Sequence, residues 1–103
     1  MKSIEKPHIL NLVIRAVKEI GHETKNNRLI KAELKTELYG VNGNLDSFLL
    51  VRLIVDVEER VSSEIGKEIV IADERAMSLK SSPFRNIESL TEHTFNLLNK
   101  EDE

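Results

Sequence analysis

The chain has 103 residues, of which 40% are hydrophobic, 32% are charged and only 4% are aromatic. This composition predicts one globular domain, residues 1–103, whose aliphatic core leaves little room for a buried catalytic cavity. The absence of cysteine excludes disulfides and thiolate metal sites. No apolar run is long enough for a membrane span, and no signal-peptide-like region follows Met1, so we expect a cytoplasmic protein.

The net charge of −3 is unevenly distributed along the chain. Residues 1–36 carry eight Lys and Arg against four Asp and Glu, whereas residues 37–103 carry seven against fourteen. The acidic second part argues against binding to a nucleic-acid backbone. It suits partner proteins with basic docking surfaces, although most single surface charges are merely solvated.

Apolar residues at helical spacing predict a first helix from Pro7 to about Gly21. Pro7 suits the first turn, and Gly21 is expected to end the helix. The predicted buried stripe consists of Leu10, Val13, Ile14, Val17 and Ile20.

A long connection over residues 22–45 follows this helix. Loops of this length are uncommon unless they are functional. Leu38 and Tyr39 are predicted to anchor the connection on the core. A short helical turn is predicted around Leu29, Ile30, Glu33 and Leu34.

A second helix is predicted from Asp46 or Ser47 to about Ser63. Its buried stripe comprises Leu50, Leu53, Ile54, Val57 and Val61. Pairing among charged side chains four residues apart is expected at Arg52, Asp56 and Arg60. Apolar surface beyond this stripe, a mark of partner binding, is expected at Leu49, Val51 and Val55.

An extended connector over residues 65–71, a short helix over residues 74–79 capped by Asp73, and a last helix after Asn86 complete the prediction. The predicted inner side of the last helix comprises Ile87, Leu90, Thr94, Leu97 and Leu98. The expected fold is a small all-α bundle with three main helices and one short third helix.

Ser47 is the candidate functional residue, because it stands where a glycine-containing loop meets the second helix. A helix N-terminus has unpaired N–H groups and a dipole that favour an anion. An Asp or Ser at this place is most often only a helix cap. A hydrolase is disfavoured, since no histidine lies near Ser47 in the sequence and no Gly-x-Ser-x-Gly motif surrounds it.

The segment Leu45-Asp46-Ser47-Phe48 resembles the Asp-Ser-Leu attachment motif of acyl carrier proteins, with Phe48 in place of the leucine. The order of helices over residues 7–99 resembles that family too. Further similar segments are Glu37–Gly40 before the motif, Val57–Val61 in the second helix and Ile69–Ile71 before the short helix.

The resemblance implies that Ser47 receives 4′-phosphopantetheine from coenzyme A through a separate phosphopantetheinyl transferase. The arm's thiol would then carry an acyl or aminoacyl group as a thioester. Leu45, Asp46 and Phe48 would frame the site, with Phe48 packed partly under the arm. A small groove for the acyl chain is expected between the second helix, at Leu50, Ile54 and Val57, and the region of Ile71 and Met77.

Docking to partner enzymes is expected on the second helix, at Leu49, Arg52, Asp56, Glu58 and Glu59. Fatty-acid carriers often have acidic residues directly after the motif, where this chain has Leu49, Leu50 and Arg52. The resemblance therefore implies a carrier for a specialised lipid or secondary-metabolite pathway. Its partners would be acyl-transferring, ligase or synthase enzymes. The chain would be a monomer, without enzymatic activity and without a metal.

The alternative is a non-catalytic helical interaction module, in which Ser47 is only a helix cap. The apolar surface at Leu49, Val51 and Val55 would then bind a partner helix.

Overall fold

The computed structural model describes residues 4–40, 43–66, 68–72 and 83–101. These residues form four helices and no strand, which confirms the predicted small all-α fold. The helices are α1 (Lys6–Thr24), α2 (Asn27–Ile30), α3 (Ser47–Ile65) and α5 (Ile87–Glu101). The short helix predicted over residues 74–79 lies outside the described residues.

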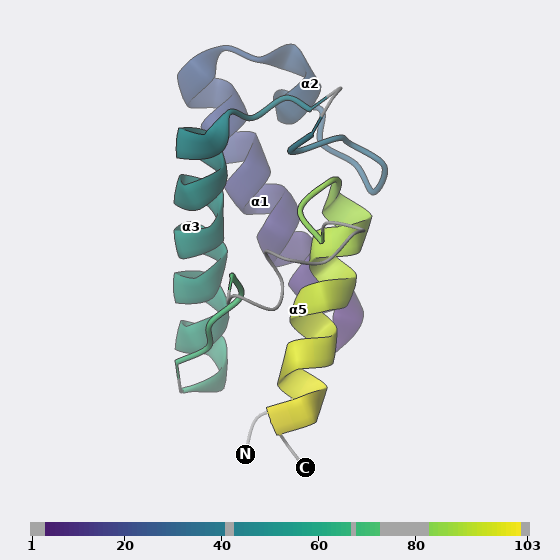
Figure 1. Cartoon of the computed structure of the whole chain (residues 1–103), viewed down its shortest axis with the longest axis vertical. Coiled ribbons are helices and arrows are strands. Elements are labelled where there is room, and N and C mark those ends of the chain that lie inside the picture. Colours follow the sequence, from purple (N-terminus) through teal and green to yellow (C-terminus); the bar gives the residue numbers. More distant parts are fainter. Residues whose placement is uncertain (1–3, 41–42, 67, 73–82, 102–103) are drawn as a thin grey trace.

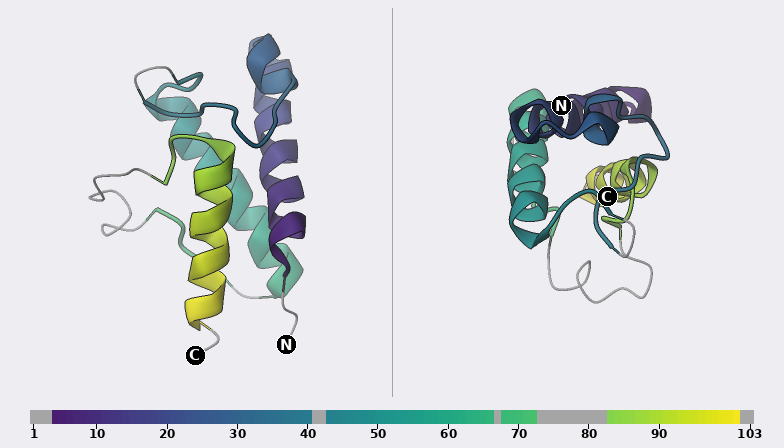
Figure 2. Two further views of the ribbon diagram at one scale, coloured as in Figure 1. Left: turned by 90° about the vertical axis from the view of Figure 1, so that its right-hand side faces the viewer. Right: turned by 90° about the horizontal axis from the view of Figure 1, so that it is seen from above.

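The three long helices follow the long axis of a molecule measuring 39 × 27 × 21 Å (Figure 1). α1 runs antiparallel to both α3 and α5 (Figure 1). Each of the other described helices packs against α1. The view from above shows α3 and α5 on different sides of α1 (Figure 2). α1 is therefore the common support of the described fold.

The position of α1 between two neighbours explains why its buried face is wider than the predicted stripe. Val13, Val17 and Ile20 are buried as expected, whereas Leu10 and Ile14 are only half-buried. The additional buried residues are Ile9, Leu12, Ala16 and Gly21. A helix that contacts neighbours on two sides must bury a broader arc than one apolar stripe.

The prediction that Gly21 ends the first helix is wrong. α1 continues to Thr24 and ends at Lys25, which has a left-handed backbone with φ of 56°. Gly21 instead lies beneath α2, where an added Cβ would be only 2.6 Å from the backbone N of Ile30. The glycine is therefore needed for the close approach of two backbone segments.

The buried stripe predicted for the second helix is confirmed at all five positions along α3. The Asp56–Arg60 pair is confirmed, and Arg60 also pairs with Glu19 of α1. Burial opposes a charged Arg60, but the hydrogen bonds to the two carboxylates prevail and raise its pKa. Arg52 pairs with Glu23 of α1 rather than with Asp56.

The connection after α2 is tied to the start of α5 through its backbone. The N–H of Leu38 donates to the carbonyl of Arg85 at 2.8 Å, and the N–H of Tyr39 donates to that of Phe84 at 3.0 Å. Leu38 is fully buried, as predicted, but Tyr39 is 37% exposed, so its predicted anchoring role is wrong. Neighbouring residues of an extended segment point to opposite sides, so burying Leu38 turns Tyr39 outward.

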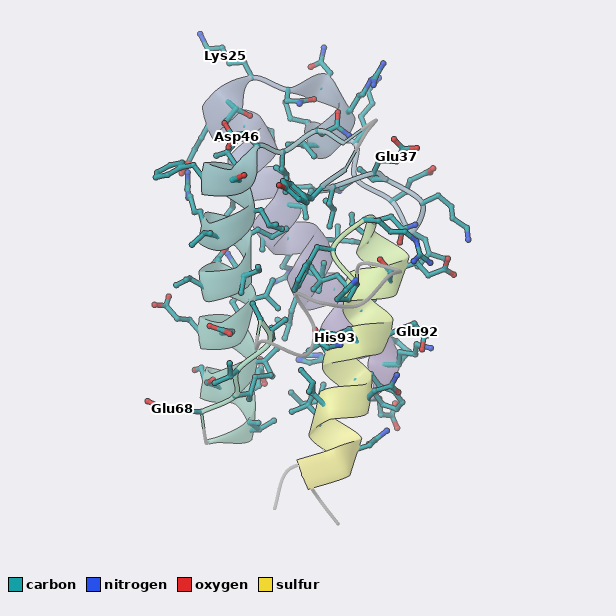
Figure 3. All side chains as sticks on the ribbon, in the orientation of Figure 1. Lys25, Glu37, Asp46, Glu68, Glu92 and His93 are labelled. Atoms are coloured by element: carbon teal, nitrogen blue, oxygen red, sulfur yellow. The ribbon has the colours of Figure 1, made fainter. Side chains whose placement is uncertain are left out.

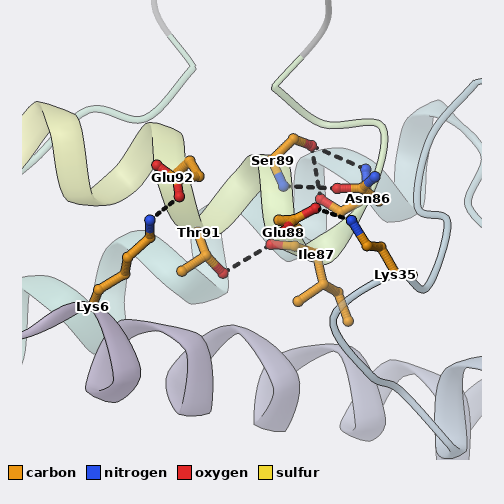
Figure 4. Close-up of polar contacts among 8 residues, drawn as sticks. All are labelled: Lys6, Lys35, Asn86, Ile87, Glu88, Ser89, Thr91 and Glu92. Atoms are coloured by element: carbon orange, nitrogen blue, oxygen red, sulfur yellow. Dashed lines mark hydrogen bonds and ion pairs between the residues drawn. The ribbon is translucent and has the colours of Figure 1, made fainter.

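The N-terminus of α5 is closed by the same connection. The N–H groups of Ile87 and Glu88 donate to the carbonyls of Thr36 and Leu34, at 3.1 and 2.9 Å. The helix begins directly after Asn86, as predicted, and Asn86 Oδ1 accepts the N–H of Ser89 at 2.7 Å (Figure 4). Two ion pairs, Lys35–Glu88 and Lys6–Glu92, join this helix to the first part of the chain (Figure 4).

Replacement of Gly21 by alanine tests the close contact between α1 and α2. We expect Gly21→Ala to lower the free energy of unfolding by about 1–3 kcal/mol, measured by urea denaturation, because the new Cβ overlaps the α2 backbone. Helix propensity alone predicts the opposite sign, since alanine favours a helix by about 1 kcal/mol over glycine. The control His22→Ala, at the exposed neighbouring position, should change stability little. A stabilised Gly21→Ala variant would contradict the observed packing.

The Lys35–Glu88 pair predicts a contribution to acid sensitivity. The hydrogen bond and charge of Lys35 lower the pKa of Glu88 below its ordinary value of 4.5, against a smaller opposing effect of burial. A lowered folded-state pKa means that the pair stabilises the fold at neutral pH and is lost as the pH falls through that pKa. We expect the melting temperature of Glu88→Gln to fall less between neutral and acid pH than that of the wild type.

The matched control for this pH experiment is Glu33→Gln, at an exposed position without an ion pair among the described residues. Its melting temperature should follow the wild-type pH profile. Identical profiles for the wild type and Glu88→Gln would show that the pair contributes no stability.

Candidate functional site

Ser47 is the first residue of the 19-residue helix α3, and its side chain is exposed. Asp46 is the N-cap, and its Oδ1 accepts the N–H of Leu49 at 2.8 Å. The predicted capping role of Asp46 is thereby confirmed. The cap occupies one of the free N–H groups of the first turn and leaves the Ser47 hydroxyl at the open end of the helix.

The segment before Ser47 is fixed by its contact with Leu38. Leu45 is buried, and its N–H donates to the Leu38 carbonyl at 2.9 Å. Asn44 Nδ2 donates to the Glu37 carbonyl at 2.7 Å. Because the N–H of Leu38 is itself bonded to the Arg85 carbonyl, the start of α3 is tied through Leu38 to the segment that enters α5. The buried Leu45 side chain thus anchors the chain two residues before Ser47.

The Tyr39 hydroxyl lies 3.3 Å from Ser47 Oγ, within hydrogen-bond distance, and either oxygen can donate. Both side chains are exposed. The sequence analysis missed Tyr39 because it assigned the ring to the core. The signal that was available is alternation, since a buried Leu38 in an extended segment requires an outward Tyr39.

Phe48 begins an exposed apolar stripe on α3. Its side chain is 76% exposed, and Val51 and Val55 are 59% and 46% exposed. Spacings of three and four residues place these side chains on one face of the helix, away from the core. The predicted excess of apolar surface is confirmed for Val51 and Val55, whereas Leu49 is half-buried against the core.

The residues predicted to dock partners are dispersed over α3. Arg52 is bonded to Glu23, and Asp56 is bonded to Arg60. Glu58 accepts the backbone N–H of Ile71 at 2.7 Å, so its carboxylate serves an internal contact. Glu59 is exposed and makes no ion pair within the described part of the chain. Docking by this set stays a prediction, with Glu59 its unengaged acidic member.

The side chains predicted to border an acyl-chain groove are packed as core. Leu50, Ile54, Val57 and Ile71 are each 7% exposed or less, and Met77 lies outside the described residues. The carbonyl of Ile71 lies 2.9 Å from Nε2 of His93 on α5 (Figure 3 labels His93). Glu58 and His93 thus hold the Ile71 backbone between α3 and α5.

Within the described residues, no group of three or more His, Cys, Asp or Glu side chains is placed to bind a metal ion. No described helix is long and apolar enough to cross a membrane. Comparison with protein-family models, curated proteins and solved structures finds no match to this chain. The functional reading therefore depends on the residues around Ser47.

Proposed function

We propose that the chain is an acyl carrier protein, which holds an acyl or aminoacyl group as a thioester on a 4′-phosphopantetheine arm at Ser47. The observation that carries the proposal is an exposed serine hydroxyl at the start of a long helix, directly after a loop that backbone hydrogen bonds hold in place. A tethered thiol would supply the sulfur nucleophile that a chain without cysteine lacks.

The residues around Ser47 fit a phosphate ester. Coenzyme A would be the donor: a bond forms between Ser47 Oγ and phosphorus, the pyrophosphate bond breaks, adenosine 3′,5′-bisphosphate leaves, and a base of the transferase takes the serine proton. The N-terminal end of α3 favours the resulting negative charge. The Tyr39 hydroxyl is placed to donate a hydrogen bond to an oxygen on Ser47.

The exposed Phe48 would meet the phosphopantetheinyl transferase and then lie beside the arm. Acyl-transferring, ligase or synthase enzymes of a specialised lipid or secondary-metabolite pathway would dock along α3. The site residues are those predicted above, with Tyr39 added. In this proposal the protein is a cytoplasmic monomer that presents its cargo to partner enzymes and catalyses no reaction itself.

A second candidate is favoured by the exposed stripe of Phe48, Val51 and Val55. Such a stripe resembles the anchor residues of a helix that packs against a partner. In that case the chain is an interaction module, and Ser47 is only the first residue of a capped helix. The two candidates differ in whether Ser47 is modified.

Intact-protein mass spectrometry distinguishes the two candidates. Wild type and Ser47→Ala are incubated with coenzyme A, Mg²⁺ and each of two transferases of different specificity. We expect one phosphopantetheine addition on the wild type and none on Ser47→Ala, because alanine lacks the nucleophilic oxygen. Circular dichroism should show that both proteins are folded. A folded wild type that neither transferase modifies would contradict the carrier proposal and favour the interaction module.

The contact between Tyr39 and Ser47 predicts a slower modification in Tyr39→Phe. Loss of one hydrogen bond that orients the serine oxygen should reduce kcat for the transfer about three- to tenfold, at little change in KM for the carrier. Since Tyr39 is the only tyrosine and the chain has no tryptophan, the wild-type ultraviolet spectrum should change when Ser47 is modified. An unchanged spectrum together with an unchanged kcat would show that the hydroxyl contact has no role.

A further inference from the structure

The end of the molecule that carries α2 has two adjoining shallow depressions that are widely open to solvent, and we call them hollows. Arg28 and Asn44 line both hollows. Lys25 adds a second cation to the first hollow, and Lys31 adds one to the second. We call the three cations Lys25, Arg28 and Lys31 the basic end.

The cations of the basic end are free to bind an external acid. All three are exposed, and none makes an ion pair within the described part of the chain. Four other basic residues, two in the first part of the chain and two on α3, are engaged with glutamate or aspartate of the same chain. These are Lys6, Lys35, Arg52 and Arg60.

Lys25 has a backbone conformation that glycine adopts more readily. Its φ of 56° and ψ of 39° place it in the left-handed region, where it closes α1 by donating its N–H to the Gly21 carbonyl. A side chain with a Cβ is disfavoured there, and glycine is the usual residue. Lys25 therefore holds a positive charge at the C-terminal end of α1, where the helix dipole favours a cation.

The lining distinguishes between classes of ligand. Glu33 and Glu37 border the second hollow beside Arg28 and Lys31, and they would repel a densely charged polyphosphate. Among the described residues, no aromatic side chain that could stack on a base lines either hollow. A protein surface with spaced carboxylates suits this mixed lining, and the planar Arg28 guanidinium can bind a carboxylate through two hydrogen bonds.

We propose that the basic end, formed by Lys25, Arg28 and Lys31, is an interaction surface for acidic side chains of a partner protein. The surface lies at the same end of the molecule as Asp46, the cap of α3 (Figure 3). Asn44 of both hollows is three residues before Ser47. A partner bound at the basic end would therefore lie close to the start of α3. The inference does not depend on modification of Ser47.

The test is an NMR titration of the isotope-labelled full chain with a short peptide in which glutamates are spaced by alanines. We expect the amide signals of residues 24–31 and of Asn44 to shift, and the affinity to fall as salt screens the charges. Removal of two of the three cations in the double variant Arg28→Gln, Lys31→Gln should weaken peptide binding about three- to tenfold. Lys25→Gly should also weaken binding while the melting temperature stays the same or rises, because glycine suits that backbone.

Two comparisons make the test specific. Lys18→Gln removes one charge from an exposed lysine of α1 that makes no ion pair with any described residue and does not line the hollows, and it should leave binding unchanged. Lys25→Gly also removes one charge. If Lys18→Gln weakened peptide binding as much as Lys25→Gly does, the proposal would be overturned, because binding would then follow net charge alone. Absence of peptide binding to the wild type, or tighter binding of tripolyphosphate than of the peptide, would also overturn it.

Discussion

The backbone hydrogen bonds between residues 34–39 and residues 84–88 are the constraint on which the position of Ser47 depends. A connection between two helices has few backbone partners of its own, and buried polar groups must be paired. Here the connection pairs with the segment entering α5 and with the first N–H groups of that helix. The Leu38 carbonyl accepts the N–H of Leu45, so the segment directly before Ser47 is fixed as well. These hydrogen bonds thus fix the start of α3 relative to the start of α5, although the two helices pack against α1 rather than against each other.

The central position of α1 determines which surfaces remain open. Because α1 packs against α2, α3 and α5, its apolar residues are buried on more than one side. It also requires glycine at position 21, where the α2 backbone approaches closely. Among the described helices, α3 packs only against α1. Its outer face therefore stays exposed, and Phe48, Val51 and Val55 lie there without cover from any described residue. An exposed apolar stripe next to a serine at a capped helix start would serve a carrier and an interaction module alike.

Periodicity was sufficient to predict the three long helices, since each has apolar residues that repeat at helical spacing. The errors arose where tertiary contacts decide. Gly21 reads as a helix stop from local rules, but the backbone of Ile30 requires a residue without Cβ inside the helix. Tyr39 reads as a core residue, but burial of Leu38 turns it towards Ser47. The hydroxyl contact joins residues eight positions apart through a loop whose path no local pattern determines.

The spatial arrangement of charge also differs from its arrangement in the sequence. The basic first part of the chain does not present all of its cations to solvent, because Lys6 and Lys35 pair with glutamates of α5. Its own glutamates at positions 19 and 23 pair with arginines of α3. This exchange engages Glu19 and Glu23, whereas Lys25, Arg28 and Lys31 make no ion pair among the described residues. A partner that approaches Ser47 therefore meets a basic surface at that end of the bundle and an apolar stripe along α3. Electrostatic attraction governs encounter, whereas apolar burial supplies contact energy, so the two surfaces can contribute separately to one docking event.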